Sequence, residues 1–337
     1  MAPLTDTSVE FNRENKTIDV VKRLGVITAD RVNLMNHPAD SPVTIFNPAM
    51  EVVNDNFRLY ARIVLGYYTY ASAVLEMTIP MDELESITRG RYRGRLVLKP
   101  DNVYDIFGVE DPRISLVGGK PVITYCGRTV QYFKPGIERV LPMAAARENR
   151  DWKKVSVFKF AGEQIVSDKN AFLTDLDGPK FFHRIHTVDE VYHCIVSSVQ
   201  NDVLDKGELT EVTIQGGTIP IKPAGFEDRI GWGTPPVKVD GEYLLLLHAI
   251  DKTTQWYKAF AVLMDRSARI SAVTPCYMME PRESYEVYGD RPFTVFPCGL
   301  CRVDDKLLVS YGAADFATGI GEIDLGELMS MLESNRV

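Results

Sequence analysis

The residue with the clearest potential for catalysis is Asp111, in the segment Gly108-Val-Glu-Asp-Pro-Arg113. Proline has a fixed φ angle and restricts the residue before it, so Pro112 would hold the Asp111 carboxylate in one place. A general acid requires such fixed placement. An aspartate that only caps a turn before proline is the alternative. We favour the catalytic interpretation because Asp111 is the single carboxylate among five equivalent positions of a repeat.

The repeat consists of a turn signal followed by an apolar, strand-forming run. Its five turns begin at Asn54, Gly118, Asp177, Asp240 and Asp304, at intervals of 64, 59, 63 and 64 residues. Asn-Asp, Gly-Gly and Asp-Gly pairs tolerate positive φ angles, so each copy is predicted to be a β-hairpin. About sixty residues accommodate a four-stranded sheet with one long loop, so the five copies predict an all-β protein, a five-bladed β-propeller.

Two positions of each repeat are expected to face the propeller axis. The first, seven residues before each turn, is occupied by Asn47, Asp111, Asn170, Gly233 and Pro297. The second, seven or eight residues after the turn begins, is occupied by Arg62, Tyr125, Arg184, His248 and Tyr311. A polar residue at a strand end ordinarily only meets solvent. Because five copies each end in a strong donor or acceptor, we expect these side chains to converge on one polar pocket instead.

Three parts of the chain follow from the repeat. Residues 1–40 are expected to form an N-terminal arm that wraps either a blade or a neighbouring subunit. In the second case the protein would be a homo-oligomer. Residues 41–322 form the propeller with the catalytic site, and residues 323–337 a short closing helix with Leu325, Leu328 and Leu332 at helical spacing.

Composition excludes several classes of function. The 38 Lys and Arg residues are outnumbered by 46 Asp and Glu, and no long basic run occurs, which argues against nucleic acid or an anionic membrane as a partner. No segment approaches the ~20 apolar residues of a membrane span, and no secretory signal begins the sequence, so a cytoplasmic location is expected. Cys298 and Cys301 form an isolated CxxC without a second pair, so no metal and no cofactor are expected.

Several segments together resemble glycoside hydrolase family 130, the five-bladed propellers that include the mannoside phosphorylases. They extend over most of the predicted propeller and comprise Phe46–Ala49, Gly108–Arg113, Gly231–Pro236, Tyr288–Gly299 and Tyr311–Asp315. The resemblance implies inverting phosphorolysis of a β-mannoside. Asp111 would protonate the departing oxygen through the mannose 3-hydroxyl, and inorganic phosphate would attack the opposite face to give α-mannose 1-phosphate.

The resemblance also implies the binding residues. Asn47, Arg62 and Asp315 correspond to positions that hold the mannose and its acid, and Tyr125 is expected beside them from its place in the repeat. The positions that hold phosphate correspond to Lys169, Arg184, Arg229, His248 and Tyr257. Here Lys169 and Arg229 exchange the usual basic types, and segments 66–70 and 129–148 depart from the family pattern.

Two other functions remain possible at this stage. An inverting β-mannosidase needs a second carboxylate to activate water, for which Glu227, Asp228 and Asp290 are candidates. A propeller that only binds glycans is the second alternative. A phosphorylase needs one acid and a cluster of cations for its phosphate, which Lys169, Arg184 and Arg229 would supply. Such a cluster should also lower the pKa of Asp111, whereas a direct general acid requires a raised pKa.

Overall fold

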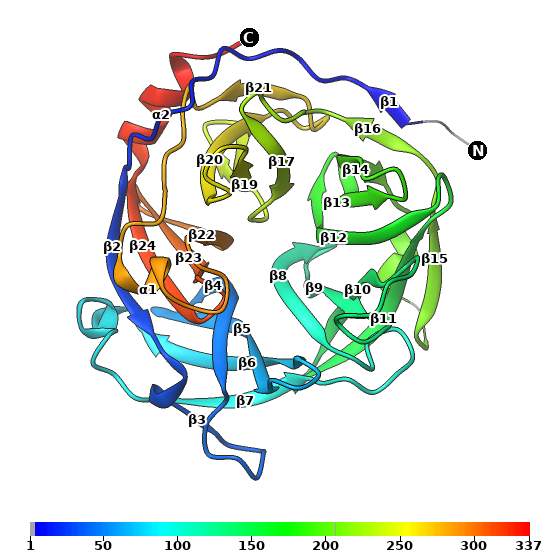
Figure 1. Cartoon of the computed structure of the whole chain (residues 1–337), viewed down its shortest axis with the longest axis vertical. Coiled ribbons are helices and arrows are strands. Elements are labelled where there is room, and N and C mark those ends of the chain that lie inside the picture. The colour runs from blue at the N-terminus through cyan, green and yellow to red at the C-terminus, as the bar shows by residue number, and fades with distance from the viewer. Residues whose placement is uncertain (1–3, 206) are drawn as a thin grey trace.

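Five β-sheets, in which most neighbouring strands are antiparallel, surround a central axis in the computed structural model, which describes residues 4–205 and 207–337 (Figure 1). The predicted five-bladed β-propeller is confirmed. The strand nearest the axis in each blade is the first of its sheet: β4 (Thr44–Val53), β8 (Val109–Val117), β12 (Ile165–Leu176), β17 (Glu227–Trp232) and β22 (Val295–Val303). These five strands position the site.

The other strands of each blade follow outward. Blade I continues with β5 (Asn56–Gly66), β6 (Ala71–Pro80) and β7 (Tyr92–Leu98), and blade II with β9 (Lys120–Arg128), β10 (Val140–Glu148), β11 (Asp151–Phe160) and β15 (Thr210–Ile214). Blade III adds β13 (Gly178–Thr187), β14 (Tyr192–Ser198) and β16 (Gly217–Ile219). Blade IV adds β18 (Val237–Val239), β19 (Glu242–Asp251), β20 (Tyr257–Met264) and β21 (Ile270–Val273), and blade V adds β23 (Lys306–Ala313) and β24 (Ala317–Asp324).

The repeated turns are hairpins, as predicted. Asn54 and Asp55 have φ angles of 48° and 56° and join β4 to β5, while Gly118 and Gly119 do the same between β8 and β9. Such left-handed pairs match the twist of the flanking strands. In blade IV the turn at Asp240 joins β18 to β19, because residues 233–236 separate β18 from the innermost strand β17.

The segment before β4 runs along the outside of the propeller, passes blade IV and pairs with strands of three other blades (Figure 1). Strand β1 (Leu4–Asp6) pairs with β16 of blade III, β2 (Val21–Ile27) pairs with β24 of blade V, and β3 (Val32–Leu34) pairs with β7 of blade I. Because β2 comes from the start of the chain and completes the last blade, it closes the ring and covers an edge that would otherwise be unpaired.

Helical structure is short and peripheral. It comprises η1 (Ala29–Arg31), η2 (Met81–Ser86), η3 (Asn201–Leu204), α1 (Ser284–Val287) and α2 (Leu325–Glu333). Helix α2 confirms the predicted C-terminal helix: the Asp324 side chain accepts the Glu327 amide proton at its start, and its apolar face packs on blades IV and V. None of the helices in the described ranges has the length and apolar character of a membrane span.

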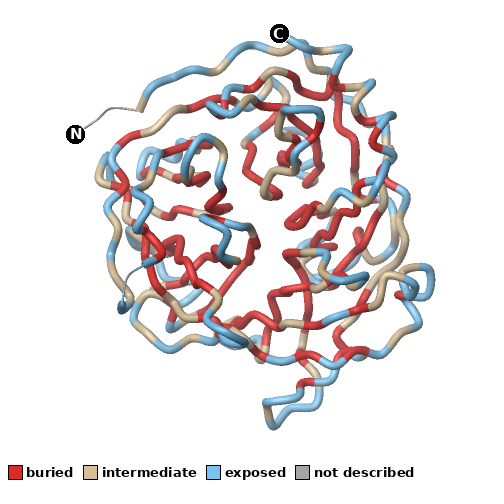
Figure 2. The backbone as a smooth tube through the Cα atoms, turned by 180° about the vertical axis from the view of Figure 1, so that it is seen from behind, coloured by how far each residue is buried: buried red, intermediate tan, exposed pale blue. Residues whose placement is uncertain are grey.

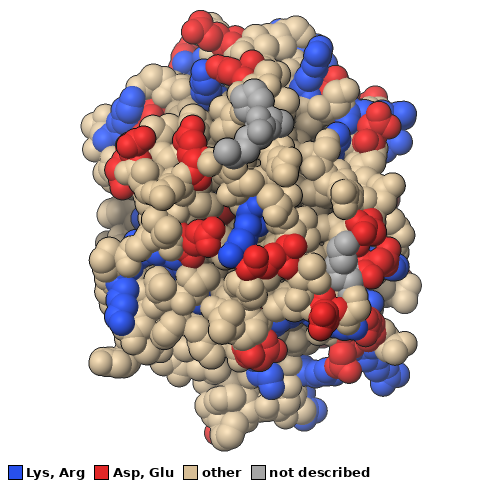
Figure 3. All heavy atoms as spheres, turned by 90° about the vertical axis from the view of Figure 1, so that its right-hand side faces the viewer, with Lys and Arg blue, Asp and Glu red and all other residues tan. Residues whose placement is uncertain are grey.

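Burial is strongest on the strands around the axis and between adjacent blades, and weakest on the outer loops (Figure 2). On the side that faces right in Figure 1, acidic and basic side chains are interspersed rather than gathered by sign (Figure 3). This face therefore has no concentrated basic patch.

Ring closure by β2 generates the first prediction. Ile27 is fully buried in the core shared by blades I and V, whereas Ile18, in the same segment, is 48% exposed. Replacing Ile27 with alanine should lower the free energy of unfolding by about 2–5 kcal/mol because it leaves a cavity. Ile18→Ala should change it by less than about 0.5 kcal/mol. Urea unfolding measures both, and equal effects would show that β2 does not carry ring closure.

Candidate active site

Local distortions of the innermost strands aim the functional side chains at the axis. All five strands shift register by a β-bulge, between Phe46 and Ala49 in β4 and between Glu110 and Arg113 in β8, for example. Within three of the bulges Asn47, Asp111 and Asn170 have φ angles of 47°, 50° and 54°. Asn and Asp tolerate this left-handed conformation better than other non-glycine residues, and bulges commonly redirect side chains beside active sites.

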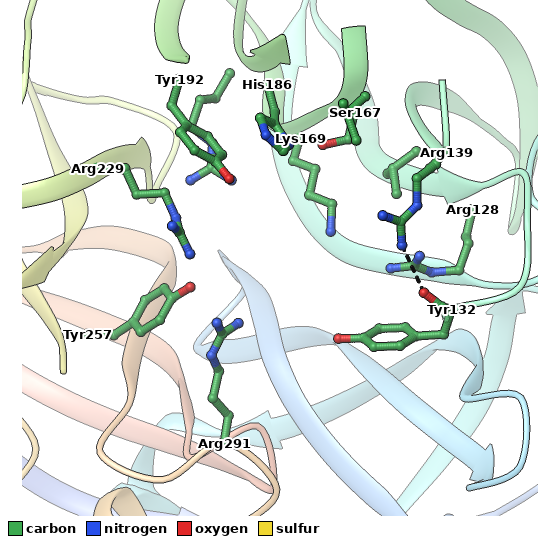
Figure 4. Close-up of a pocket in the computed structure, with 13 residues that line it drawn as sticks. Arg128, Tyr132, Arg139, Ser167, Lys169, His186, Tyr192, Arg229, Tyr257 and Arg291 are labelled. Carbon is green, nitrogen blue, oxygen red and sulfur yellow. Dashed lines mark hydrogen bonds between the residues drawn. The ribbon is translucent and has the colours of Figure 1, made fainter. Parts of the chain in front are cut away.

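Two adjoining pockets, an inner and an outer chamber, lie at the axis, share part of their lining and together form the axial cavity. The inner chamber is lined by Asn47, Arg62, Glu110, Asp111, Asn170, His248, Thr294, Phe296 and Asp315. The outer chamber is lined by Arg139, Val140, Val166, Ser167, His186, Tyr192 and Arg229 (Figure 4). Arg128, Tyr132, Lys169, Arg184, Tyr257 and Arg291 line both. The Asp111 carboxylate therefore shares the cavity with the predicted cations Lys169, Arg184 and Arg229.

Asp111 is held by neighbours from two blades. One carboxylate oxygen accepts hydrogen bonds from Asn47 Nδ2 at 2.8 Å and from Arg62 Nη1 at 3.0 Å. The buried Arg113 side chain donates to the Asp111 carbonyl at 2.7 Å and, across the axis, to the Gly233 carbonyl at 2.6 Å. Both the backbone and the carboxylate of Asp111 are thus fixed.

A second carboxylate, Glu110, stabilises the cations of this chamber. It accepts two hydrogen bonds from Arg128, at 2.7 and 3.1 Å, and one from Arg62 at 3.1 Å. Glu110 is buried, and the two guanidinium groups hold its pKa far below the ordinary value despite the opposing effect of burial. Glu110 is therefore a fixed anion. Neither Glu110 nor Arg128 was predicted as a site residue from the sequence, although Glu110 is part of the motif that contains Asp111.

The two remaining acids have opposite pKa shifts. Burial and Glu110 raise the pKa of Asp111, but Arg62, Arg113 and the hydrogen bond from Asn47 outweigh them and the net shift is downward. Burial raises the pKa of Asp315 to about 6, with Asp111 adding to the increase and Arg291 and Arg62 opposing it. In the free cavity Asp111 is ionised at neutral pH, and Asp315 titrates close to neutrality.

The predicted phosphate residues form one cluster. The Tyr192 ring lies 5.4 Å from the Arg184 guanidinium and 4.9 Å from that of Arg229, while Tyr257 stacks on His248 at 5.9 Å. Burial and the nearby arginines, Arg184 first among them, hold the pKa of His248 well below its usual value, so the imidazole is neutral. Among the described residues, Lys169 and Arg184 have no carboxylate within 4 Å, whereas Arg229 pairs with Asp228 at 2.8 Å.

Two glycines of the family-like segments make room for this arrangement. A Cβ atom at Gly231 would lie 2.4 Å from His248 Nε2, and one at Gly312 would lie 1.8 Å from Asn47 Oδ1. Both distances are far inside van der Waals contact. A side chain at either position would displace a residue of the cavity wall.

The prediction that Tyr125 binds substrate is wrong. Tyr125 is fully buried between blades, and its hydroxyl donates to Asp105 at 3.0 Å; Tyr311 is equally buried and donates to Glu286 at 2.7 Å. The register explains the error, because Arg62 and His248 lie eight residues after their turns begin, whereas Tyr125 and Tyr311 lie seven. Arg184 also lies seven residues after its turn begins, but that hairpin is one residue shorter, since Leu176 pairs directly with Gly178. One residue along a strand reverses the face. The corresponding partners of the innermost strand are Cys126 and Gly312.

The candidate second acids do not line the cavity. Glu227 is buried in an ion pair with Arg13 at 2.7 Å, Asp228 pairs with Arg229, and Asp290 accepts a hydrogen bond from the Tyr70 hydroxyl at 3.2 Å. The Tyr70 ring in turn stacks on Tyr132 at 5.2 Å, so segments 66–70 and 129–148 meet beside the cavity that Tyr132 lines.

The raised pKa of Asp315 generates a prediction about stability. Because the folded protein binds this proton more tightly than the unfolded chain, stability is lost as pH rises from about 4 to about 6. Asp315→Asn removes that loss. Because the side chain is half-buried, the variant should raise the free energy of unfolding by about 1–2 kcal/mol at pH 7.5 and leave it unchanged near pH 4. Thermal unfolding at both pH values measures this, with the exposed Asp189→Asn as control. Destabilisation of equal size at both pH values would contradict the assignment.

Comparison with known proteins identifies a family whose members this chain resembles. A model of glycoside hydrolase family 130, described as beta-1,4-mannooligosaccharide phosphorylase, matches residues 11–334. A beta-1,2-mannobiose phosphorylase of Thermoanaerobacter sp. (strain X514) is 23% identical over 317 residues, 86% of this chain and 96% of that protein. A 1,2-beta-oligomannan phosphorylase of the same organism is 24% identical over 234 residues, 69% of this chain and 73% of that protein.

Solved structures share the fold. The beta-1,2-mannobiose phosphorylase from Listeria innocua, in complex with beta-1,2-mannobiose, has a TM-score of 0.67 at 18% identity and covers 94% of this chain and 97% of its own. The match to the family model extends from the N-terminal segment to helix α2 and includes every residue that lines the cavity. The chain belongs to glycoside hydrolase family 130.

Proposed function

We propose that the protein cleaves β-mannosides by inverting phosphorolysis and releases α-mannose 1-phosphate. The observation that carries this proposal is the composition of the axial cavity: Asp111, fixed by Asn47 and Arg62, shares it with Lys169 and Arg184, two cations without carboxylate partners among the described residues. The named relatives, which are mannobiose and oligomannan phosphorylases, support the same conclusion.

In this proposal the mannose occupies the inner chamber. Asn47, Arg62 and Asp315 hold its hydroxyls, and Asp111 lies beside the 3-hydroxyl. Phosphate binds to Lys169, Arg184, Arg229, Tyr257 and the neutral His248, on the other face of the sugar. Its oxygen forms a bond to the anomeric carbon as the bond to the departing oxygen breaks, and the cations offset the charge of the attacking ion.

The proton moves by a relay. Asp111 gives its proton to the 3-hydroxyl oxygen, and the proton of that hydroxyl passes to the departing oxygen, so the leaving sugar departs neutral. The lowered pKa of Asp111 in the free cavity opposes this step. Binding of a phosphate dianion and displacement of water by the sugar both raise the pKa of a nearby carboxyl. Asp111 therefore acquires its proton in the loaded cavity, and afterwards Arg62 and Asn47 stabilise the carboxylate.

Hydrolysis is the less well supported alternative. An inverting hydrolase places a second carboxylate roughly 6.5–9.5 Å from the acid to activate water. Glu227, Asp228 and Asp290 are absent from the cavity wall, and Glu110 is occupied by two arginines. Asp315 also lines the inner chamber, where the proposal assigns it to the mannose hydroxyls. Activation of water does not need a cluster of cations, whereas binding of a phosphate dianion does.

Phosphate dependence tests the reaction. Incubated with β-1,2- and β-1,4-mannobiose, the protein should release mannose and a sugar phosphate in phosphate buffer and almost none of either in phosphate-free buffer of the same ionic strength. Equal mannose in both buffers, without sugar phosphate, would establish a hydrolase instead.

Asp111→Asn tests the acid. The amide keeps the size of the side chain but carries no transferable proton, so kcat should fall by about 10²–10⁴ while the melting temperature stays within a few degrees of wild type. Asp189→Asn, on an exposed turn, should leave both unchanged. A near-native rate in the Asp111 variant, measured by phosphate release in the synthetic direction, would exclude this role.

Arg229→Ala tests the phosphate site. Loss of a charged hydrogen-bond donor costs about 1.5–3 kcal/mol, so the KM for phosphate should rise by roughly tenfold or more. The KM for mannobiose should change by less than about threefold, because Arg229 lines only the outer chamber. The exposed Arg266→Ala is the control. Parallel increases in both KM values would indicate that Arg229 has a structural role.

A further inference from the structure

The outer chamber is more cationic than one orthophosphate requires. Its volume is about 240 Å³, somewhat below the roughly 300–1,000 Å³ of drug-sized ligand sites, so it suits a small anionic ligand. Figure 4 shows its basic side chains on opposite sides: Arg229 and Arg291 approach from one side and Arg128 and Arg139 from the other. The predicted phosphate residues do not include Arg139.

Arg139 has no anionic partner in the described part of the chain. Its Nη2 atom donates to the Tyr132 carbonyl at 2.9 Å, its buried Nε atom has no hydrogen-bond partner, and no carboxylate lies within 4 Å. The adjacent Glu138 pairs instead with Lys159 at 3.7 Å. A guanidinium group is a planar fork that matches phosphate and carboxylate, so its unpaired position on a cavity wall points to an anionic ligand.

The neighbours of Arg139 are suited to the same ligand. The Ser167 hydroxyl and the imidazole of His186 line the outer chamber and not the inner one. Both supply hydrogen-bonding groups, and the His186 ring is oriented by the contact of its Nε2 atom with Glu190 at 2.9 Å and by stacking on Tyr192 at 4.2 Å. Burial and Arg128 lower the pKa of nearby Lys169, as expected where cations crowd together without enough anions.

Resting on the proposed phosphorolysis, we infer that the outer chamber binds a second phosphoryl group beside orthophosphate, at Arg139, Ser167 and His186. Two sources have this chemistry. The group belongs to the leaving sugar, as a sugar phosphate, or it is the second half of a diphosphate that occupies the place of orthophosphate. Arg139 lies in segment 129–148, which is expected from the sequence to depart from the family pattern.

The test has two arms, one for each source. In the synthetic direction, kcat/KM with α-mannose 1-phosphate as donor is compared for mannose 6-phosphate and mannose as acceptors. In the binding arm, calorimetry compares the dissociation constants of diphosphate and orthophosphate. We expect a preference of about tenfold or more for the phosphorylated ligand in one arm. Arg139→Gln should reduce it to about twofold, whereas the exposed Arg302→Gln should retain it.

The outcomes separate this inference from the proposed function. Similar values for both ligands in both arms, or a preference that survives Arg139→Gln, would overturn the second subsite while turnover of mannose still supports phosphorolysis. A diphosphate preference that depends on Arg139, without orthophosphate release from α-mannose 1-phosphate, would support the subsite and refute phosphorolysis. If Arg139→Gln fails to fold, Arg139→Lys keeps the charge without the fork and should lose part of the preference.

Discussion

Compensation of buried charge around Glu110 is the constraint on which the site depends. Arg62 and Arg128 converge on this carboxylate, and Arg62 also reaches Asp111. An ionised group inside a protein is costly unless it is paired and hydrogen-bonded. The Glu110 pairs allow the chamber to keep two arginines beside Asp111, and Arg113 fixes the backbone of the same bulge from the axis. Without these contacts Asp111 would have neither a fixed position nor a stable carboxylate.

The propeller makes this arrangement possible through its bulges. Equivalent bulges on β4, β8 and β12 turn Asn47, Asp111 and Asn170 inward, and the closing strand β2 completes the ring that holds the five innermost strands in place. The same scaffold can present an amide in one blade and an acid in the next. Asp111 is the only carboxylate among the five equivalent positions of the repeat, and this difference separates an acid from its binding partners.

The fold was predictable because its signals are local. Turn pairs such as Gly118-Gly119 and Asp240-Gly241 need only their own sequence, and their spacing counts the blades. The site was predictable where a position follows from the turn, as for Arg62 and His248, and failed for Tyr125 because a one-residue offset exchanges the two faces of a strand. Arg128 and Arg139 gave no signal, because they reach the cavity from strand ends whose placement depends on tertiary contacts. Arg291 lies in the family-like segment Tyr288–Gly299, but nothing in its spacing assigned it a role.

The position of the phosphate cluster relative to Asp111 determines the stereochemistry of the product. If a single acid and an anion site flank the sugar on opposite faces, the first sugar phosphate formed must have the inverted configuration at the anomeric carbon. Proton NMR of β-mannobiose turnover in phosphate buffer measures this directly. The account predicts that α-mannose 1-phosphate accumulates as the first product. Initial formation of β-mannose 1-phosphate would contradict it.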